Sequence, residues 1–114
     1  MTNPVATLHI DIEGGWGGSS RSLYELVSNL DRDRISPVIA YRQDGPARQW
    51  YADIGIPAYH VPDIPSFVPR QTKAVRNLLA SCPRFLNIRH AARRITDITK
   101  KHACQLIHLN YEGL

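Results

Sequence analysis

Short apolar runs alternate with segments of helical periodicity, and this alternation constrains the fold more than any other feature of the sequence. The short runs are rich in β-branched and aliphatic residues, as buried strands are, and lie at 5–12, 36–41, 58–61 and 105–109. The segments with apolar residues three or four apart lie at about 20–30, 47–54 and 84–102. This order predicts an α/β domain, a doubly wound parallel sheet with helices on both faces.

The helix ends are marked less clearly than the helices. Ser19 or Ser20 is the expected N-cap of the first helix, although Ser22 with Glu25 also fits a capping box. Gly55, followed closely by proline, predicts the end of the second helix. The segment 62–83 holds four prolines, and we expect a loop there with a helical turn around 72–80.

Length and composition set the class of protein. A chain of 114 residues with 43% hydrophobic and 21% charged residues has room for one domain. No stretch reaches the roughly 18 apolar residues that cross a bilayer, and the first residues lack the features of a signal peptide, so we expect a cytoplasmic protein. Cys82 and Cys104 fit no metal-binding spacing, and buried reduced thiols are expected.

Charge is distributed unevenly along the chain. The segment 66–102 carries nine basic residues and one acid, whereas the rest carries five basic residues and nine acids. The basic face of the helix at 84–102 has three interpretations: a solvated surface, a peripheral contact with an anionic membrane, or a nucleic-acid site. The last is disfavoured, because no aromatic-interleaved basic motif accompanies the charge.

The residues most suited to chemistry lie in the glycine cluster EGGWGGSSRS, between the first strand and the first helix. Ligands of open α/β sheets bind beyond the carboxyl ends of the strands, where this loop lies. Glycines let backbone N–H groups approach an anion, and the start of a helix adds unpaired N–H groups, so phosphate is the expected ligand. The spacing fits neither GxxxxGK[ST] nor GxGxxG, and a tight turn without a ligand stays open as the alternative.

The order of motifs resembles the N-terminal domain of GT-B glycosyltransferases, most closely the family 4 type. In that family a strand ends in a glycine loop, GG-x-x-R opens a helix, a GIP segment leads to the third strand, and an apolar strand with histidine closes the first half. The matching residues here are Gly17, Gly18, Arg21, Gly55, Ile56, Pro57, Leu106, Ile107 and His108. Ser20 and Gln105 depart from the pattern, at positions to which no chemistry is attributed.

The resemblance implies transfer of a sugar from a nucleotide-sugar donor to an acceptor hydroxyl, retaining and without a metal or cofactor. The acceptor would be a carbohydrate or a lipid-linked molecule. A second Rossmann-like domain with E-x7-E would bind most of the donor, and nothing here corresponds to it. The chain thus resembles a partial N-terminal domain over 1–114, truncated after about four strands, inactive alone and without assigned catalytic residues. Its loop next to the donor diphosphate would consist of Gly15, Gly17, Gly18, Ser19 and Arg21.

Further polar and aromatic residues are expected at the same sheet edge. Asn110, Tyr111 and Glu112 follow the fourth strand and are candidates for acceptor binding, with a plain polar loop as the alternative. Trp16 is expected either to stack on a sugar or base, or to cover the core.

Four more residues have mainly structural interpretations. Asp11 and Glu13 are expected to orient the glycine loop or to bind sugar hydroxyls, and His9 and His108 to be buried structural residues. Two other function classes stay open: a non-enzymatic phosphate- or nucleotide-binding module, and a protein-interaction module.

Overall fold

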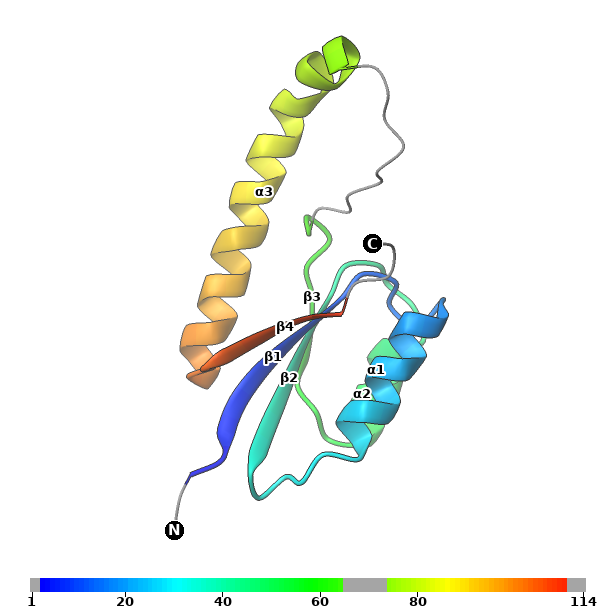
Figure 1. The fold of residues 1–114 in the computed structure, drawn as a ribbon, viewed down its shortest axis with the longest axis vertical. Helices are drawn as coiled ribbons and strands as arrows, with labels where there is room; N and C mark the ends of the chain where they lie inside the picture. The colour runs from blue at the N-terminus through cyan, green and yellow to red at the C-terminus, as the bar shows by residue number, and fades with distance from the viewer. Residues whose placement is uncertain (1–2, 65–73, 111–114) are drawn as a thin grey trace.

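Strands and helices alternate through the computed structural model, which describes residues 3–64 and 74–110, with side chains from 88 onward in the second segment (Figure 1). The strands are β1 (Val5–Asp11), β2 (Ile35–Tyr41), β3 (Ala58–His60) and β4 (Leu106–Asn110). The helices are α1 (Gly18–Ser28), α2 (Ala47–Asp53) and α3 (Ala74–His102). Each predicted strand and helix is present, with ends shifted by a few residues except at the start of α3.

The strands form one parallel sheet in the order β3-β2-β1-β4. The chain moves outward from β1 through β2 to β3, and α3 then carries it back to the other side of β1, where β4 pairs over Thr7–Asp11. The direction of winding therefore reverses between β1 and β4. The predicted parallel α/β sheet is confirmed, and its topology is Rossmann-like.

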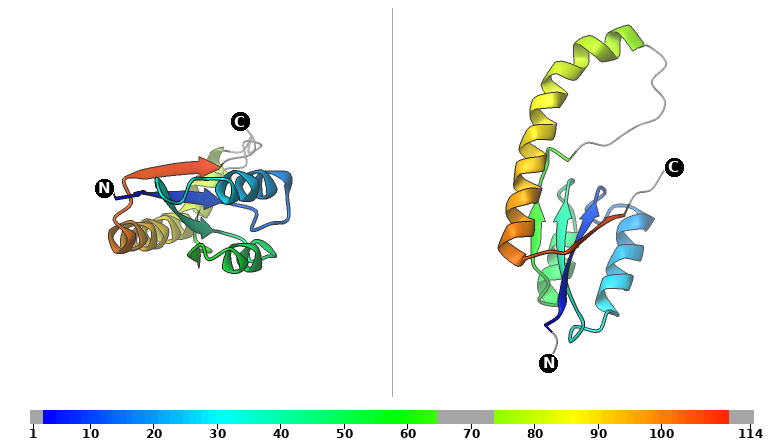
Figure 2. Two further views of the ribbon diagram at one scale, coloured as in Figure 1. Left: turned by 90° about the horizontal axis from the view of Figure 1, so that it is seen from below. Right: turned by 60° about the vertical axis from the view of Figure 1, so that its left-hand side comes forward.

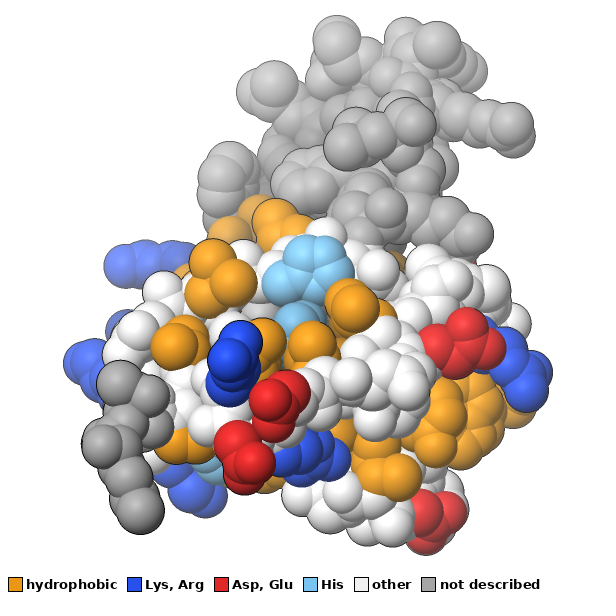
Figure 3. Space-filling view, turned by 60° about the horizontal axis from the view of Figure 1, so that its bottom comes forward, with side chains coloured by type: hydrophobic (Ala, Val, Ile, Leu, Met, Phe, Trp, Pro, Cys, Tyr) orange, Lys and Arg blue, Asp and Glu red, His pale blue; other side chains and the backbone are white. Residues whose placement is uncertain are grey.

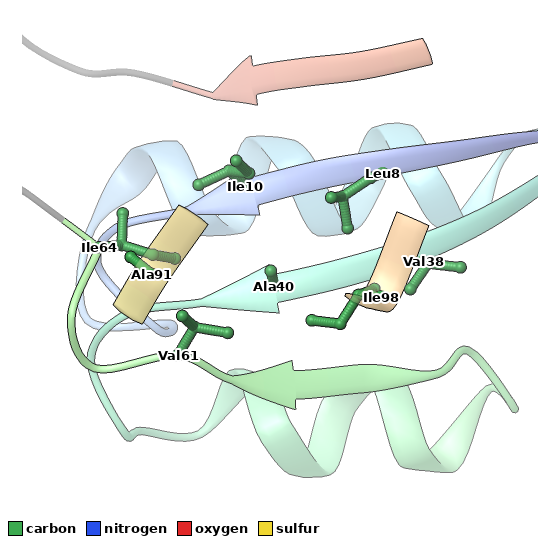
Figure 4. Close-up of a cluster of buried hydrophobic side chains, with 8 residues drawn as sticks. All are labelled: Leu8, Ile10, Val38, Ala40, Val61, Ile64, Ala91 and Ile98. Atoms are coloured by element: carbon green, nitrogen blue, oxygen red, sulfur yellow. The ribbon is translucent and has the colours of Figure 1, made fainter. Parts of the chain in front are cut away.

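Helices cover both faces of the sheet, and each face has its own hydrophobic core. On one face, α1 and α2 pack against β2 through residues such as Leu23, Ile39 and Tyr51. On the other face, α3 packs on β1, β2 and the segment after β3 (Figure 4). The right-hand view of Figure 2 shows α3 and α1 on opposite sides of the strands. The eight buried residues of the α3 core are Leu8, Ile10, Val38, Ala40, Val61, Ile64, Ala91 and Ile98.

The third helix is longer than the sequence pattern predicts. It begins at Ala74 rather than near Arg84, so the helical turn expected around 72–80 belongs to α3 and the expected loop is wrong for 81–83, while 65–73 lie outside the described residues. Pro83 lies inside the helix, where proline removes a backbone N–H and usually ends helical structure. With 29 residues, α3 is about 43 Å long and extends past the sheet (Figure 1).

The second helix, α2, ends where Gly55 predicts. Gly55 adopts a left-handed φ of 72° directly after the C-cap residue Ile54. The end of α3 uses the same conformation without glycine, since Ala103 has a φ of 52° and the Cys104 N–H donates to the Thr99 carbonyl at 2.8 Å.

Cys104 is a free thiol, as expected, and its burial against the α3 core is partial. Partial burial raises the pKa of its thiol, because burial disfavours the thiolate. The Cys82 side chain lies outside the described part of the chain.

Candidate functional site

Two chain segments far apart in the sequence meet at the carboxyl edge of the sheet, at the reversal between β1 and β4. The loop after β1 leads into α1, and Asn110 ends β4 beside Asp11, its partner in the β1–β4 register. The Asn110 Nδ2 donates to the Ser19 carbonyl at 2.8 Å. The predicted glycine loop and the predicted acceptor residue Asn110 therefore belong to one site. Tyr111 and Glu112 lie outside the described residues.

The first two glycines of the loop are needed for packing. Gly14 and Gly15 have left-handed φ values of 64° and 106°. A Cβ on Gly14 would overlap the Gln43 carbonyl, and a Cβ on Gly15 would lie 2.7 Å from the Ala47 nitrogen. The Ala47 N–H also donates to the Gly14 carbonyl at 3.0 Å. Both glycines therefore let the β1–α1 loop lie directly against the β2–α2 loop, which accounts for Gly15 without a ligand.

The next two glycines differ from this pair and from each other. Gly17 is the N-cap of α1 with an ordinary extended backbone, and a Cβ there would overlap the carboxylate of Glu13. Gly18 is exposed and has no protein atom within 4 Å of the position that a Cβ would occupy. Its backbone conformation does not require glycine either. Among the glycines that the structure describes at this edge, Gly18 is thus the one that neither internal packing nor backbone conformation explains, and it opens the start of α1 to solvent.

The start of α1 differs from the predicted caps. The helix begins at Gly18, and its N-cap is Gly17, which has no side chain to cap it. Ser19, Ser20 and Ser22, the three expected caps, therefore all lie inside the helix. Ser20 instead donates its hydroxyl to Asp11 Oδ1 at 2.7 Å, and both residues are fully buried.

The buried carboxylate of Asp11 holds the glycine loop by hydrogen bonds. Its Oδ1 also accepts the N–H of Glu13 at 3.1 Å, which confirms the expectation that Asp11 orients the glycine loop. Its Oδ2 is buried and accepts no hydrogen bond within the described residues. The half-buried Glu13 places its carboxylate against Gly17, so two acidic side chains lie beside the start of α1.

Trp16 does not cover the core, because 68% of its surface is exposed. Its Nε1 donates to the Asp44 carbonyl at 3.0 Å, and a Cβ on Gly45 would lie 2.6 Å from the same nitrogen. The indole is therefore held by one edge on the β2–α2 loop.

Arg21 lies in the first turn of α1 and is exposed. Within the described residues its side chain makes no hydrogen bond or ion pair, so its charge is available beside Gly18 and Ser19. Gly18, Ser19 and Arg21 carry no acidic side chain and form the part of the loop best suited to an anion.

A pair of histidines joins β1 to β4. His9 Nδ1 and His108 Nδ1 are 3.1 Å apart, and His9 Nε2 lies 2.9 Å from the Thr7 hydroxyl. Burial, and secondarily the nearby His108, lowers the pKa of His9 to about 4, so His9 is neutral near pH 7. The structural interpretation of His9 is supported, whereas His108 is half-exposed. The sequence analysis missed their contact, because it depends on strand order.

The C-terminal part of α3 exposes basic side chains on the side away from the core. Arg89, Arg93 and Lys100 follow one another at helical spacing opposite Ala91 and Ile98, which are buried. We call these three residues the basic stripe. In the space-filling view of Figure 3, Lys and Arg side chains project from the molecular outline.

Two broader features of the described residues bear on function. The side chains of residues 3–64 and 88–110 include no group of three His, Cys, Asp or Glu that could hold a metal ion. None of the helices in these residues is both long and apolar enough to span a bilayer.

No family model matches this chain, and no curated protein or solved structure is significantly similar to it. The geometry of the sheet edge and the chemistry of its side chains are therefore the grounds on which a function is proposed.

Proposed function

We propose that this chain is part of a GT-B glycosyltransferase that transfers a sugar from a nucleotide-sugar donor to an acceptor hydroxyl. The observation that carries the proposal is the meeting of the glycine loop with the end of β4, where the winding of a parallel sheet reverses. Substrates of open α/β proteins bind in this position.

Gly18 and the start of α1 are suited to contact the donor diphosphate. The N–H groups of a first helical turn and the positive end of the helix dipole stabilise anions. No side chain of Gly17 or Gly18 blocks this end, and the exposed Arg21 adds a positive charge within the same turn. During sugar transfer, these groups would stabilise the charge that develops on the departing diphosphate.

The acidic side of the loop suits hydroxyl groups instead. Carboxylates accept hydrogen bonds from sugar hydroxyls and repel phosphate, so in this proposal the acceptor lies near Glu13 and the diphosphate lies further along the loop, at Gly18 and Arg21. Asn110 bounds the site at the end of β4.

The basic stripe supports a peripheral contact with anionic lipid headgroups on the cytoplasmic leaflet, as an enzyme with a lipid-linked acceptor would need. Cosedimentation with vesicles containing 30 mol% phosphatidylserine tests this contact. We expect binding that is lost at high salt and in an Arg89→Glu, Arg93→Glu variant. Equal binding to neutral vesicles would contradict it.

Amide chemical shifts in ¹H–¹⁵N spectra test the donor site residue by residue. Titration with UDP-glucose and GDP-mannose should shift the amides of Gly17, Gly18 and Ser19. In Gly18→Val, the new side chain enters the open space above α1, and donor affinity should fall at least about tenfold. Ser22→Ala, an exposed change on the next turn of α1, is the matched control. Loop amides that do not respond to any nucleotide sugar would refute the donor site.

A protein-interaction module is the second candidate, favoured by the exposed apolar side chains of β4. Leu106, Ile107 and Leu109 are 58%, 48% and 64% exposed, on both faces of the strand. Such a module predicts no response of the loop amides to nucleotide sugars, so the same titration separates the two functions.

A further inference from the structure

Trp16 is the most exposed of the large hydrophobic side chains that the structure describes. A free indole at the surface loses the hydrophobic stabilisation that burial would give it. It therefore needs an explanation in its surroundings. Trp16 lies at the carboxyl edge of the sheet, one residue before the N-cap of α1, inside the site described above.

The indole has a fixed orientation. Its Nε1 donates to the Asp44 carbonyl at 3.0 Å, and Gly45 lies so close that any side chain there would displace the ring. Its backbone is fixed as well, because the Trp16 N–H donates to the Glu13 carbonyl at 3.3 Å in the turn. A ring that is already ordered loses little conformational entropy when a ligand stacks on it.

The groups around the ring favour a neutral, hydroxyl-rich ligand. The electron-rich face of an indole attracts the slightly positive C–H groups on one face of a pyranose. Glu13 belongs to the same turn, and Asp44, exposed, belongs to the loop that holds the ring. Their carboxylates accept hydrogen bonds from hydroxyls and repel the phosphate of a nucleotide.

We propose that Trp16 is a fixed stacking platform for a pyranose ring, in a loop region whose acidic residues Glu13 and Asp44 disfavour an anionic ligand. This inference rests on the proposed function and specifies it further: the sugar that stacks on Trp16 is that of the acceptor. The donor diphosphate lies on the other side of the loop, at Gly18 and Arg21.

Fluorescence of Trp16 tests the platform directly. The chain contains one other tryptophan, Trp50, so Trp50→Phe leaves Trp16 as the sole indole. Methyl α-D-glucopyranoside, methyl α-D-mannopyranoside and N-acetylglucosamine are the probes. We expect a saturable change in Trp16 emission with at least one of them. Sorbitol, which has hydroxyls but no ring, and uridine, which has a nucleobase, are the matched ligand controls and should give none.

Saturation-transfer NMR then compares binding of the same pyranosides to variants. Trp16→Ala should weaken binding at least about fivefold, and Trp16→Phe should retain part of it, because a smaller aromatic ring still stacks. Thermal unfolding of each variant checks that the exposed substitution leaves the fold intact.

Three results would overturn the platform: no saturable response to any pyranoside, an equal response to sorbitol, or a response to uridine alone. Wild-type pyranoside affinity in Trp16→Ala would overturn it too. Loop amides that still respond to nucleotide sugars would then leave the proposed function standing. Pyranoside binding through Trp16 without any nucleotide-sugar response would instead retain the platform and reject the transferase.

Discussion

β1 and β4 are neighbours in the sheet and similar in apolar character, yet their surroundings differ sharply. In β1, Leu8 is fully buried under α3, and Asp11 is fully buried on the opposite face. In β4, Leu106 and Leu109 remain more than half exposed. Hydrophobic and histidine side chains reach the surface together on the face shown in Figure 3. The position of a strand in the sheet, rather than its composition, determines how much of it is buried.

The two strands are also held differently. β1 is paired on both sides, by β2 and β4, and its carboxyl end is fixed through Asp11. β4 is paired on one side only within the described sheet, and the side-chain hydrogen bonds that join it to other described residues are those of His108 and Asn110. At the carboxyl edge of the sheet, β1 is therefore held by more contacts than β4.

The largest difference between the two strands is expected in the free energy of unfolding when a leucine of each is replaced by alanine. Leu8→Ala leaves a cavity between the sheet and α3 and should lower the free energy of unfolding by about 2–5 kcal/mol. Leu109→Ala removes a side chain already in solvent and should cost no more than about 0.5 kcal/mol. Urea denaturation followed by circular dichroism measures both. Similar losses would show that β4 is covered in solution.

Acid should weaken the fold through His9, where the two strands touch. Unfolded, His9 takes up a proton near pH 6.5, whereas folded it does so only near pH 4. Between these values the unfolded chain binds more protons, so the free energy of unfolding falls as the pH falls, by at most on the order of 3 kcal/mol. The free energy of unfolding at several pH values from 7 to 4 measures this slope.

His9→Gln is the variant that isolates this effect from carboxylate titration, with the exposed His90→Gln as its control. The slope should be smaller in His9→Gln and unchanged in His90→Gln. Identical slopes in all three proteins would show that His9 is not buried in its neutral form.

A smaller effect than those of Leu8→Ala and of acid is expected at the end of β4. Asn110→Ala removes the half-buried bond to the Ser19 carbonyl and should cost about 1 kcal/mol. Hydrogen exchange should accelerate in β4 and stay unchanged in β2, since only β4 depends on this bond. Asn29→Ala removes a comparable but exposed bond to Glu25 and serves as the control. Equal acceleration in both strands would contradict a separately attached β4.

Much of the fold follows from local patterns in the sequence. Apolar periodicity distinguishes strands from helices, and the alternation of the two implies a parallel sheet. Gly55 marks the end of α2 because its left-handed φ is a local requirement. The glycine loop and Asn110 were placed at one edge by topology alone, and the structure joins them through a hydrogen bond.

The features that escaped prediction depend on partners distant in the sequence. Ser20 looks like an N-cap, but its hydroxyl binds Asp11 on the preceding strand. Pro83 suggests a loop, yet it lies within α3. The His9–His108 contact and the exposure of β4 depend on strand order, which composition does not reveal.

The pairing of β1 with β4 has a kinetic consequence. β1 meets β2 through a short connection, since Val5 pairs with Ile35, whereas His9 and His108 are 99 positions apart. Closing a longer loop costs more entropy, and contacts distant in the sequence slow folding. We therefore expect β1, α1, β2 and α2 to assemble early and β4 to join late. The carboxyl edge where Asn110 meets the glycine loop would then be completed only in the final step, so a newly synthesised chain would acquire most of its core before the candidate site forms.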